Sequence, residues 1–245
     1  MWLTSFKVPE GAKKILNEGM VDEITSYLPI VLALRRWQLS FCSKLHGVSF
    51  GSFYRRVSNK GPSILVVRDT NGVVFGAFIS ESIRNSTNYY GTGEMFVFTY
   101  KQLSAIDTKD SIEKTELNYL EPNKSNCDLR TSMKDCFTEF AVSEYRLTRE
   151  ESNFKKIGGD NIKESSKSIS RISVFPWSGK NCFYIYTDNS RIAIGGGGSY
   201  SLTIDGEFFR GWSSPCSTYD SPTLSSHEDF LVNAFQVWTL VDDYQ

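Results

Sequence analysis

The sequence YYGTGEMFVFTY, residues 89–100, indicates how the rest of the chain is arranged. Gly91 and Gly93 stand one residue apart and predict a tight bend, because glycine adopts positive φ angles without a Cβ clash. The apolar run that follows, residues 95–100, does not alternate with polar residues, which is typical of a strand covered on both faces. Glu94 lies where the bend meets the strand. The stretch therefore predicts a turn that leads into a central strand.

The segments around this strand predict antiparallel pairs rather than parallel ones. Residues 63–68 and 73–79 are apolar and are joined by Asp-Thr-Asn-Gly, a strong hairpin turn. Amphipathic helices are expected at residues 15–28 and 50–57, the second with Ser49 as its N-cap. Because short turns join neighbouring strands with few helices between them, the sequence predicts an α+β, mainly β fold, a sandwich of two antiparallel β-sheets flanked by a few helices. The other expected strands are residues 37–41, 182–187, 191–194, 200–204, 207–210 and 230–241.

Composition bounds the number of domains. At 245 residues, of which 40% are hydrophobic and 14% aromatic, the chain can bury a core of its own. Lysine, glutamate, serine and asparagine dominate residues 101–171, although Leu129, Met133 and Phe137 keep a helical spacing. We therefore expect a single domain over residues 1–245, with an inserted polar and partly disordered segment at about residues 101–171.

Charge and cysteine usage argue against several classes of protein. There are 27 Lys and Arg residues and 28 Asp and Glu residues, and the resulting net charge of −1 argues against a nucleic-acid partner. Residues 1–9 hold no long apolar core, and the apolar run at residues 28–34 is too short to span a bilayer. The five cysteines are odd in number and spread without a CxxC pair, as expected for reduced thiols. These features predict a soluble, cytoplasmic protein.

The glycine motifs lack the signatures of nucleotide-binding loops. Residues 195–198 are four glycines followed by Ser199 and a strand, without the lysine and helix of a P-loop. Residues 91–93 lack the third glycine of a dinucleotide fingerprint. His46 and His227 lie far apart with no cysteine pair beside either, which argues against a zinc site. We therefore expect no cofactor and no metal, and glycines that serve bends and close backbone approach.

Glu94 is the strongest single candidate for catalysis. A carboxylate packed against an aromatic strand can act as a general acid or base. Alternatively, it accepts hydrogen bonds from the glycine amides or pairs with an arginine such as Arg84 or Arg55. A cysteine with a stabilised thiolate could react with peroxide, although nothing beside Cys182 or Cys216 argues for one. We favour a structural Glu94 and ordinary thiols.

Several segments, taken together, carry a family resemblance. The most specific are YGTGE at residues 90–94 and the four glycines at residues 195–198, in this order and in similar surroundings. Further matching segments are residues 37–41, 46–49, 53–55, 62–67, 69–80, 181–184, 202–206, 211–216, 228–230 and 237–238. In these segments the chain resembles the TLDc domain, a family that includes eukaryotic oxidation-resistance proteins. The resemblance covers most of the chain outside residues 101–171.

The resemblance implies a non-enzymatic interaction module with no cofactor and no catalytic residue. Members of the family are associated with protection against oxidative stress, and several bind the cytosolic V1 sector of the vacuolar-type proton ATPase and regulate its assembly. The implied partners are V1 subunits, and the implied location is the cytoplasm, at the cytosolic face of acidic organelles, with peripheral membrane association through the pump. The family-motif residues, to which the resemblance assigns a structural or partner-binding role, are His46, Gly47, Arg55, Gly91, Thr92, Gly93, Glu94, Gly195, Gly196, Gly197, Gly198, Cys216, Glu228 and Asp229.

Two other functions stay open at this point. One is a redox-protective enzyme or scavenger that uses Glu94 or a reactive cysteine, and the other is a lineage-specific scaffold that acts through residues 101–171. That segment departs from the family pattern, which has a short connection there, and a loop of this length is unusual inside a compact domain. The chain also departs from the pattern at residues 220–222, in place of a Gly-Asn turn, and at Gln236, in place of an acid.

Overall fold

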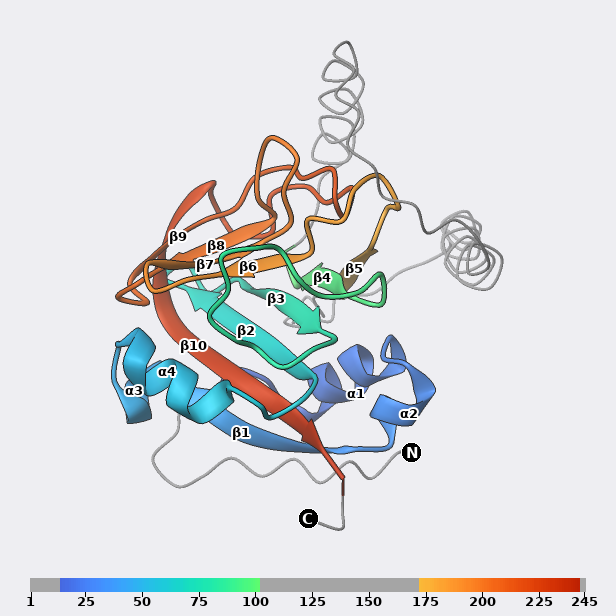
Figure 1. Cartoon of the computed structure of the whole chain (residues 1–245), viewed down its shortest axis with the longest axis vertical. Helices are drawn as coiled ribbons and strands as arrows, with labels where there is room; N and C mark the ends of the chain where they lie inside the picture. The colour runs from blue at the N-terminus through green and yellow to red at the C-terminus, as the bar shows by residue number, and fades with distance from the viewer. Residues whose placement is uncertain (1–13, 102–171, 243–245) are drawn as a thin grey trace, which may run out of the picture. The chain divides into compact units, whose positions relative to one another are not determined.

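One long strand, β10 (Asp229–Val241), belongs to two antiparallel sheets and connects them (Figure 1). The structure is a computed structural model that describes residues 14–101 and 172–242. The other strands are β1 (Arg36–Cys42), β2 (Ser63–Asp69), β3 (Val74–Ile79), β4 (Phe96–Thr99), β5 (Ser173–Pro176), β6 (Ile185–Thr187), β7 (Arg191–Ile194), β8 (Leu202–Asp205) and β9 (Arg210–Trp212). The helices are α1 (Glu18–Ser26), α2 (Ile30–Ala33), α3 (Ser43–His46) and α4 (Phe50–Val57).

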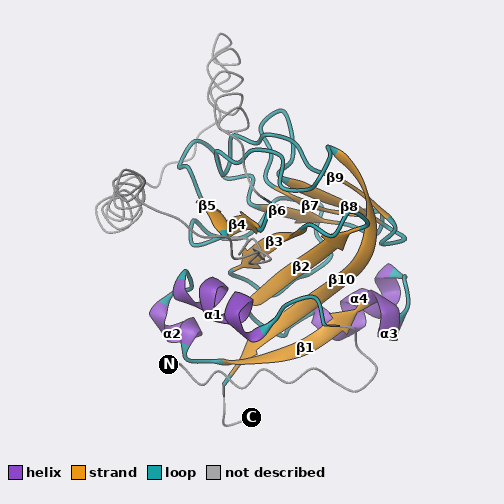
Figure 2. Ribbon diagram, turned by 180° about the vertical axis from the view of Figure 1, so that it is seen from behind, coloured by secondary structure: helices purple, strands orange, loops and turns teal. Residues whose placement is uncertain are grey.

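The two sheets share β10 and differ in their partners. The first sheet has the strand order β5-β4-β3-β2-β10-β1, and the second has the order β10-β9-β8-β7-β6. The carboxyl-terminal part of β10 lies between β2 and β1, whereas Asp229, Phe230 and Leu231 at its start pair with β9. Every pairing of the described strands is antiparallel. The predicted mainly β fold with two antiparallel sheets and a few helices is therefore confirmed (Figure 2).

Strand β2 shows why the central strands have uninterrupted apolar sequences. Its side chains alternate between two cores, because successive residues of a strand point to opposite faces. Leu65 and Val67 enter the core between the two sheets, whereas Ile64 and Val66 enter a second core that includes the apolar face of α1. Strand β4 is likewise buried at all of its positions. The prediction of a strand covered on both faces after the YGTGE motif is therefore confirmed.

Helix α1 begins later than the apolar spacing predicted. The side chain of Asn17 accepts a hydrogen bond from the backbone N–H of Met20 at 2.9 Å, so the helix starts at Glu18. Ile15 and Leu16 precede this cap but are buried in the second core all the same. Their apolar character therefore reflects burial rather than helical periodicity.

Helix α4 confirms its prediction. The Ser49 hydroxyl accepts a hydrogen bond from the backbone N–H of Ser52 at 3.3 Å and caps the helix. Phe50, Phe53 and Val57 are buried in the core between the sheets. The apolar stripe thus fixes which face of α4 meets the strands.

Two strand predictions in the second half of the chain were wrong in their bounds. The predicted strand at residues 182–187 begins only at Ile185. Residues 207–210 form mainly a turn, because the Asp205 carboxylate accepts hydrogen bonds from the backbone N–H groups of Phe209 and Arg210, at 2.9 and 3.1 Å. Strand β9 begins at Arg210 and continues to Trp212, beyond the predicted end of the strand at residue 210. The predicted insertion lies outside the described residues from residue 102 onward.

Candidate functional site

The two glycine motifs, far apart in the sequence, flank one loop of the structure. The backbones of Tyr90 and Ile185 exchange two hydrogen bonds, with nitrogen to oxygen distances of 2.9 and 3.1 Å. A methyl group at Gly91 would lie 3.0 Å from Cβ of Tyr184, and one at Gly196 would lie 2.6 Å from Cβ of Phe183. The segment before β6 is therefore held between the YGTGE turn and the four-glycine loop. Gly91 and Gly196 allow this close approach because glycine carries no Cβ.

Gly91 and Gly93 are required for different reasons. Gly91 has a φ of 111°, as the sequence predicted for the bend. Gly93 does not have a positive φ, so the same expectation is wrong at this position. A methyl group there would instead lie 2.4 Å from Cε3 of Trp177. Close contact with an aromatic ring, rather than backbone strain, excludes a side chain at Gly93.

The four-glycine loop is held by the loop that contains Cys216. The backbone N–H of Gly196 donates to the hydroxyl of Thr218 at 2.9 Å. The Cys216 thiol donates to the Gly196 carbonyl, with an Sγ to oxygen distance of 3.4 Å. Gly195 and Gly197 adopt φ angles of 82° and 83°, which favour glycine. The buried thiol of Cys216 thus serves to pack and to bond this loop.

Trp177, Asn181 and Thr218 complete this cluster, and sequence reasoning gave them no role. The indole N–H of Trp177 donates to the Asn181 carbonyl at 2.7 Å. The Asn181 side-chain oxygen accepts from the Thr218 hydroxyl at 2.8 Å and from the Phe183 N–H at 3.1 Å. No local pattern marks Thr218, because it lies in a stretch rich in Ser, Thr and Pro. Of these three residues, Asn181 alone lies in a segment that resembles the TLDc domain, so it alone could have been noticed from the sequence.

Tyr89 lies at the edge of the cluster. Its ring packs on Phe183 at 4.9 Å and on Tyr186 at 5.7 Å between ring centroids. Burial, together with a hydrogen bond to Tyr200, raises the pKa of Tyr89 to about 12. The phenol therefore stays protonated at neutral pH and acts as a hydrogen-bonding and packing group.

The structure does not place Glu94 where a buried carboxylate was expected. Its side chain is exposed, and its backbone N–H lies 3.4 Å from the Thr92 hydroxyl that accepts it. Arg84, one expected partner, pairs with Glu81 at 2.7 Å, and the other, Arg55, is exposed on α4. Glu94 has no ion pair within residues 14–101 and 172–242. Thr92, rather than Glu94, anchors the turn by donating to the Ser80 hydroxyl at 2.9 Å.

His46, Gly47 and Arg55 form a separate group on α3 and α4. His46 Nδ1 accepts a hydrogen bond from the backbone N–H of Cys42 at 3.0 Å, and Gly47 ends α3 with a φ of 81°. Partial burial and the nearby charge of Arg56 lower the pKa of His46 below its usual value. The imidazole is therefore neutral at pH 7 and serves as a structural acceptor.

This histidine group and the glycine motifs lie at opposite ends of β7. The Tyr54 hydroxyl of α4 donates to the carbonyl of Asp188 at 2.7 Å, at the turn that leads into β7. The four-glycine loop begins where β7 ends. The structure thus brings Gly91–Glu94 together with Gly195–Gly198 and Cys216, and keeps His46 and Arg55 apart from them.

Glu228 and Asp229 make a third group where β10 begins. The Glu228 carbonyl accepts a hydrogen bond from the Ser213 N–H at 2.9 Å, and Asp229 at the start of β10 pairs with Trp212 of β9. Both acidic side chains are exposed. His227, beside them, lies in a bend.

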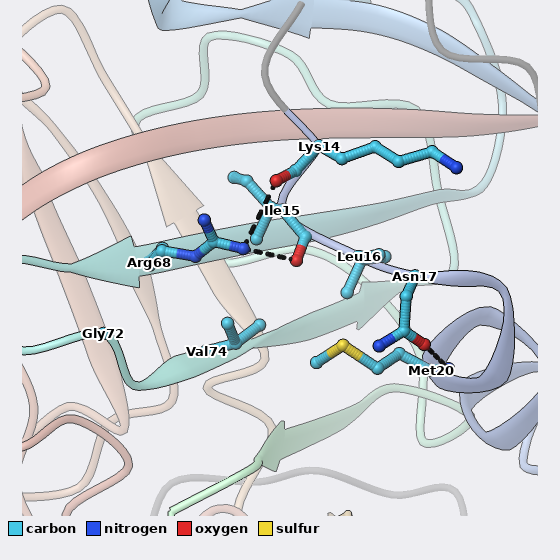
Figure 3. Close-up of a pocket in the computed structure, with 8 residues that line it drawn as sticks. All are labelled: Lys14, Ile15, Leu16, Asn17, Met20, Arg68, Gly72 and Val74. Carbon is cyan, nitrogen blue, oxygen red and sulfur yellow. Dashed lines mark hydrogen bonds between the residues drawn. The ribbon is translucent and has the colours of Figure 1, made fainter.

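Figure 3 shows a pocket between the amino-terminal segment and the β2–β3 hairpin. Its volume is about 460 Å³. Arg68 Nη2 donates to the carbonyl oxygens of Ile15 and Lys14, at 2.6 and 3.3 Å. These two bonds tie the Arg68 side chain to the segment before α1, so the pocket lies beside a contact that holds this segment on β2. The Asn17 side chain in the same view caps α1.

Two further findings concern metal ligation and membrane spanning. Within residues 14–101 and 172–242, no three His, Cys, Asp or Glu side chains are grouped so that they could hold a metal ion. In the same ranges, no helix has the length and apolar composition needed to cross a bilayer. Of the cysteines in these ranges, Cys42 and Cys216 are buried and Cys182 is exposed.

Comparison with known proteins gives the family. The model of the TLDc domain matches residues 9–126 and 146–241. Nuclear receptor coactivator 7 of Mus musculus is 26% identical over 227 residues, which cover 92% of this chain and 17% of the relative. Oxidation resistance protein 1 of Homo sapiens is 26% identical over 227 residues, or 92% of this chain and 18% of the relative. The chain thus spans less than a fifth of the length of these relatives. Because the family model matches most of its residues, the chain belongs to the TLDc domain family.

Proposed function

We propose that this chain is a non-enzymatic TLDc interaction module that binds the cytosolic V1 sector of the vacuolar-type proton ATPase and regulates its assembly. Its role is cytoplasmic, at the face of acidic organelles, and is linked to resistance to oxidative stress. Family membership supports the proposal, as does the name of one relative, oxidation resistance protein 1. The relatives are several times longer, so the proposal draws only on the part of each that this chain matches.

The observation that carries the proposal is the distribution of large apolar side chains. Val48 is 56% exposed and Phe209 53%, and both side chains line one groove of the structure. Exposed apolar side chains that lie close together mark sites of protein contact. The close contacts of Gly91 and Gly196 with the segment before β6 support a structural role for the glycine motifs in this proposal.

The test is direct capture with purified components. The immobilised chain is incubated with purified V1 sector, and bound V1 subunits are quantified against chain concentration. We expect saturable capture and a change in the amount of assembled pump when the chain is added to isolated organelle membranes. Absence of V1 from the captured fraction at all concentrations would overturn the proposal.

A deletion of residues 109–167 tests the domain organisation that the proposed function assumes. In our proposal residues 1–245 are a single TLDc domain interrupted by an insertion, so the shortened chain should retain V1 binding. Loss of binding with an unchanged melting temperature would favour the scaffold function, in which the insertion recruits the partner.

A redox function is the second candidate, and the exposed thiol of Cys182 is the observation that favours it. A thiolate attacks one oxygen of hydrogen peroxide, the O–O bond breaks, and the products are a sulfenic acid and hydroxide, with sulfur oxidised by two electrons and the peroxide reduced. Purified chain should then consume hydrogen peroxide, and Cys182→Ser should abolish the consumption. Equal consumption by the wild type, Cys182→Ser and Glu94→Gln would argue against this candidate.

A further inference from the structure

Strand β1 borders the first sheet and differs from the other edge strands in the described part of the chain. At the opposite border of that sheet, β5 ends in a proline. At the border of the second sheet, β6 is three residues long and is bridged by Tyr90 at Ile185. Strand β1, in contrast, has seven residues, RWQLSFC, with no proline or lysine, and within residues 14–101 and 172–242 it pairs with β10 alone (Figure 1). Proteins usually cover or interrupt such an edge, because it can pair with a further strand.

The backbone at the centre of β1 has the orientation that an added strand requires. The Leu240 N–H of β10 donates to the Pro62 carbonyl at 3.0 Å, on the β2 side of β10. Trp238, two residues away, also bonds toward β2, because bonding direction alternates along an antiparallel strand. Leu39 of β1 pairs with Trp238, so its N–H and carbonyl point away from β10. A strand laid beside β1 therefore meets a donor and an acceptor at Leu39.

The sequence that precedes the described residues has the pattern of a strand. In residues 2–8, WLTSFKV, the even positions hold Trp, Thr, Phe and Val, and the odd positions hold Leu, Ser and Lys. Alternation with these residue types is typical of a strand, and Pro9 ends it. The segment has as many residues as β1. It is additional to the family match, since the TLDc model begins at residue 9.

The residue to which this segment leads, Lys14, lies near the Cys42 end of β1. Arg68 Nη2 donates to the Lys14 carbonyl at 3.3 Å (Figure 3). Arg68 pairs with Ala234 in β10, and Cys42 pairs with Gln236, two residues along the same strand. A strand outside β1 is three strand positions from β2. At about 4.8 Å per strand and about 3.3 Å per residue, its nearest end lies about 16 Å from Arg68.

The length of the connection decides the direction of the added strand. An extended chain from Val8 to Lys14 reaches about 20 Å. Val8 can therefore lie beside the end of β1 but not beside Arg36, where β1 begins, because that point is about 30 Å away by the same measure. Residues 2–8 then run in the same direction as β1. Trp2 comes to lie at the start of β1.

Exposed apolar side chains are found at this end of β1. Helix α2 directly precedes the strand (Figure 1), and its Ile30 is 77% exposed. Leu34, between α2 and β1, is 60% exposed. Trp2 and Leu3 arrive beside them in the parallel arrangement, and burial of these side chains against one another is favourable. The open edge and the exposed side chains thus have one suitable occupant in common.

We propose that the open edge of β1 is a strand-binding site and that residues 2–8 of the same chain occupy it as a strand parallel to β1. Main-chain hydrogen bonds hold the segment, and its apolar side chains cover Ile30 and Leu34. A short connection keeps the segment at an effective concentration of about 1 mM, so a strand of another chain has to displace it. The segment therefore controls access to the edge. Its binding there does not depend on the V1 partner.

Amide exchange of the full chain, followed by NMR, tests the added strand. The Leu39 N–H is the reporter, and the Gln38 N–H, which points toward β10, is the control amide. The variants are Thr4→Pro and Ser5→Pro. Neighbouring N–H groups of a strand point in opposite directions, so just one of these prolines removes a hydrogen bond to β1. We expect that variant to exchange the Leu39 amide about tenfold faster than the wild type, with Gln38 unchanged in all three proteins.

A fluorescent peptide of residues 1–9, measured by anisotropy, probes the same site from outside. It should bind the disrupted proline variant. With a Kd of about 0.1 mM and an effective concentration of about 1 mM for the attached segment, the wild type should bind it about tenfold more weakly. A peptide of the same composition, with its apolar residues grouped instead of alternating, is the control and should bind neither protein.

Four results would overturn the proposal. Equal exchange of the Leu39 amide in the three proteins would exclude the added strand, and equal acceleration by both prolines would exclude its alternating bonds. Equal binding of the peptide to the wild type and to the disrupted variant would exclude occupation by the chain's own segment. Protection of Leu39 that falls on dilution would assign the edge to a second copy of the chain.

Discussion

Replacing Gly93 by alanine tests whether close contact with Trp177, rather than backbone strain, requires glycine at this position. Because Gly93 does not have a positive φ, a methyl group there meets chiefly Trp177, whose Cε3 and Cζ3 atoms would lie 2.4 and 2.7 Å away. The ring is held in place, since its N–H donates to the Asn181 carbonyl at 2.7 Å and it packs against the ring of Tyr184 with 5.6 Å between the ring centroids. Overpacking costs about 1–3 kcal/mol, and a lost hydrogen bond adds about 1 kcal/mol. We therefore expect Gly93→Ala to lower the free energy of unfolding by about 2–4 kcal/mol.

Two other glycines serve as matched controls. Gly179 has a φ of 78° and no atom within 4 Å of a built Cβ, so Gly179→Ala tests backbone strain alone, at about 1–2 kcal/mol. Gly51 lies inside α4 with open space around it, so Gly51→Ala should stabilise the protein by about 0.5–1 kcal/mol through helix propensity.

Equilibrium unfolding in urea, followed by circular dichroism, measures all three variants. A chain of this size loses about 2–4 °C of melting temperature per kcal/mol. Gly93→Ala should cost less when Trp177→Leu is also present, because the smaller side chain vacates the contact. A cost for Gly93→Ala smaller than that of Gly179→Ala, or one unchanged by Trp177→Leu, would refute the close-contact argument.

Three further changes test other contacts. Arg68→Ala removes the two bonds to the segment before α1 and should speed proteolysis there, with a loss of about 1–2 kcal/mol; unchanged cleavage would show that this contact does not hold the segment. Thr218→Val leaves the Gly196 N–H without its acceptor and should cost about 1–3 kcal/mol in urea unfolding, whereas Ser226→Ala at a less buried loop position should cost less. The lowered pKa of His46 means that the unfolded chain binds its proton first, so stability should fall as pH drops below about 6.5. His46→Gln should flatten that part of the profile, and an unchanged slope would exclude His46 as its cause.

The elements that could be predicted from the sequence are those marked by local patterns of residues. The cap at Ser49 and the apolar stripe of α4 lie within one short segment, and so does the Asn71-Gly72 turn of the β2–β3 hairpin. Each depends on neighbours along the chain, so composition and spacing suffice. The burial of β4 on both faces followed from its uninterrupted apolar residues for the same reason.

Contacts between distant segments could not be predicted in this way. The need for glycine at Gly93 comes from Trp177, which belongs to a different loop, and a sequence pattern that favours a bend cannot distinguish it from Gly91. Phe208 and Phe209 look alike in sequence, and the positive φ of the first decides which ring is buried. Glu94 was expected to be buried and paired because it lies beside an apolar strand. In the structure it belongs to the exposed turn, and the buried residues begin directly after it.

The place of β10 in both sheets affects how the chain can fold during synthesis. This strand pairs with β1, β2 and β9, yet it is the last described element to leave the ribosome. Until then β2 lacks its central neighbour and exposes an apolar edge, which invites pairing with other chains. Closure of the fold also waits for contacts of large sequence separation, which form slowly. Nascent TLDc chains of this kind should therefore depend on chaperones until their final strand is available.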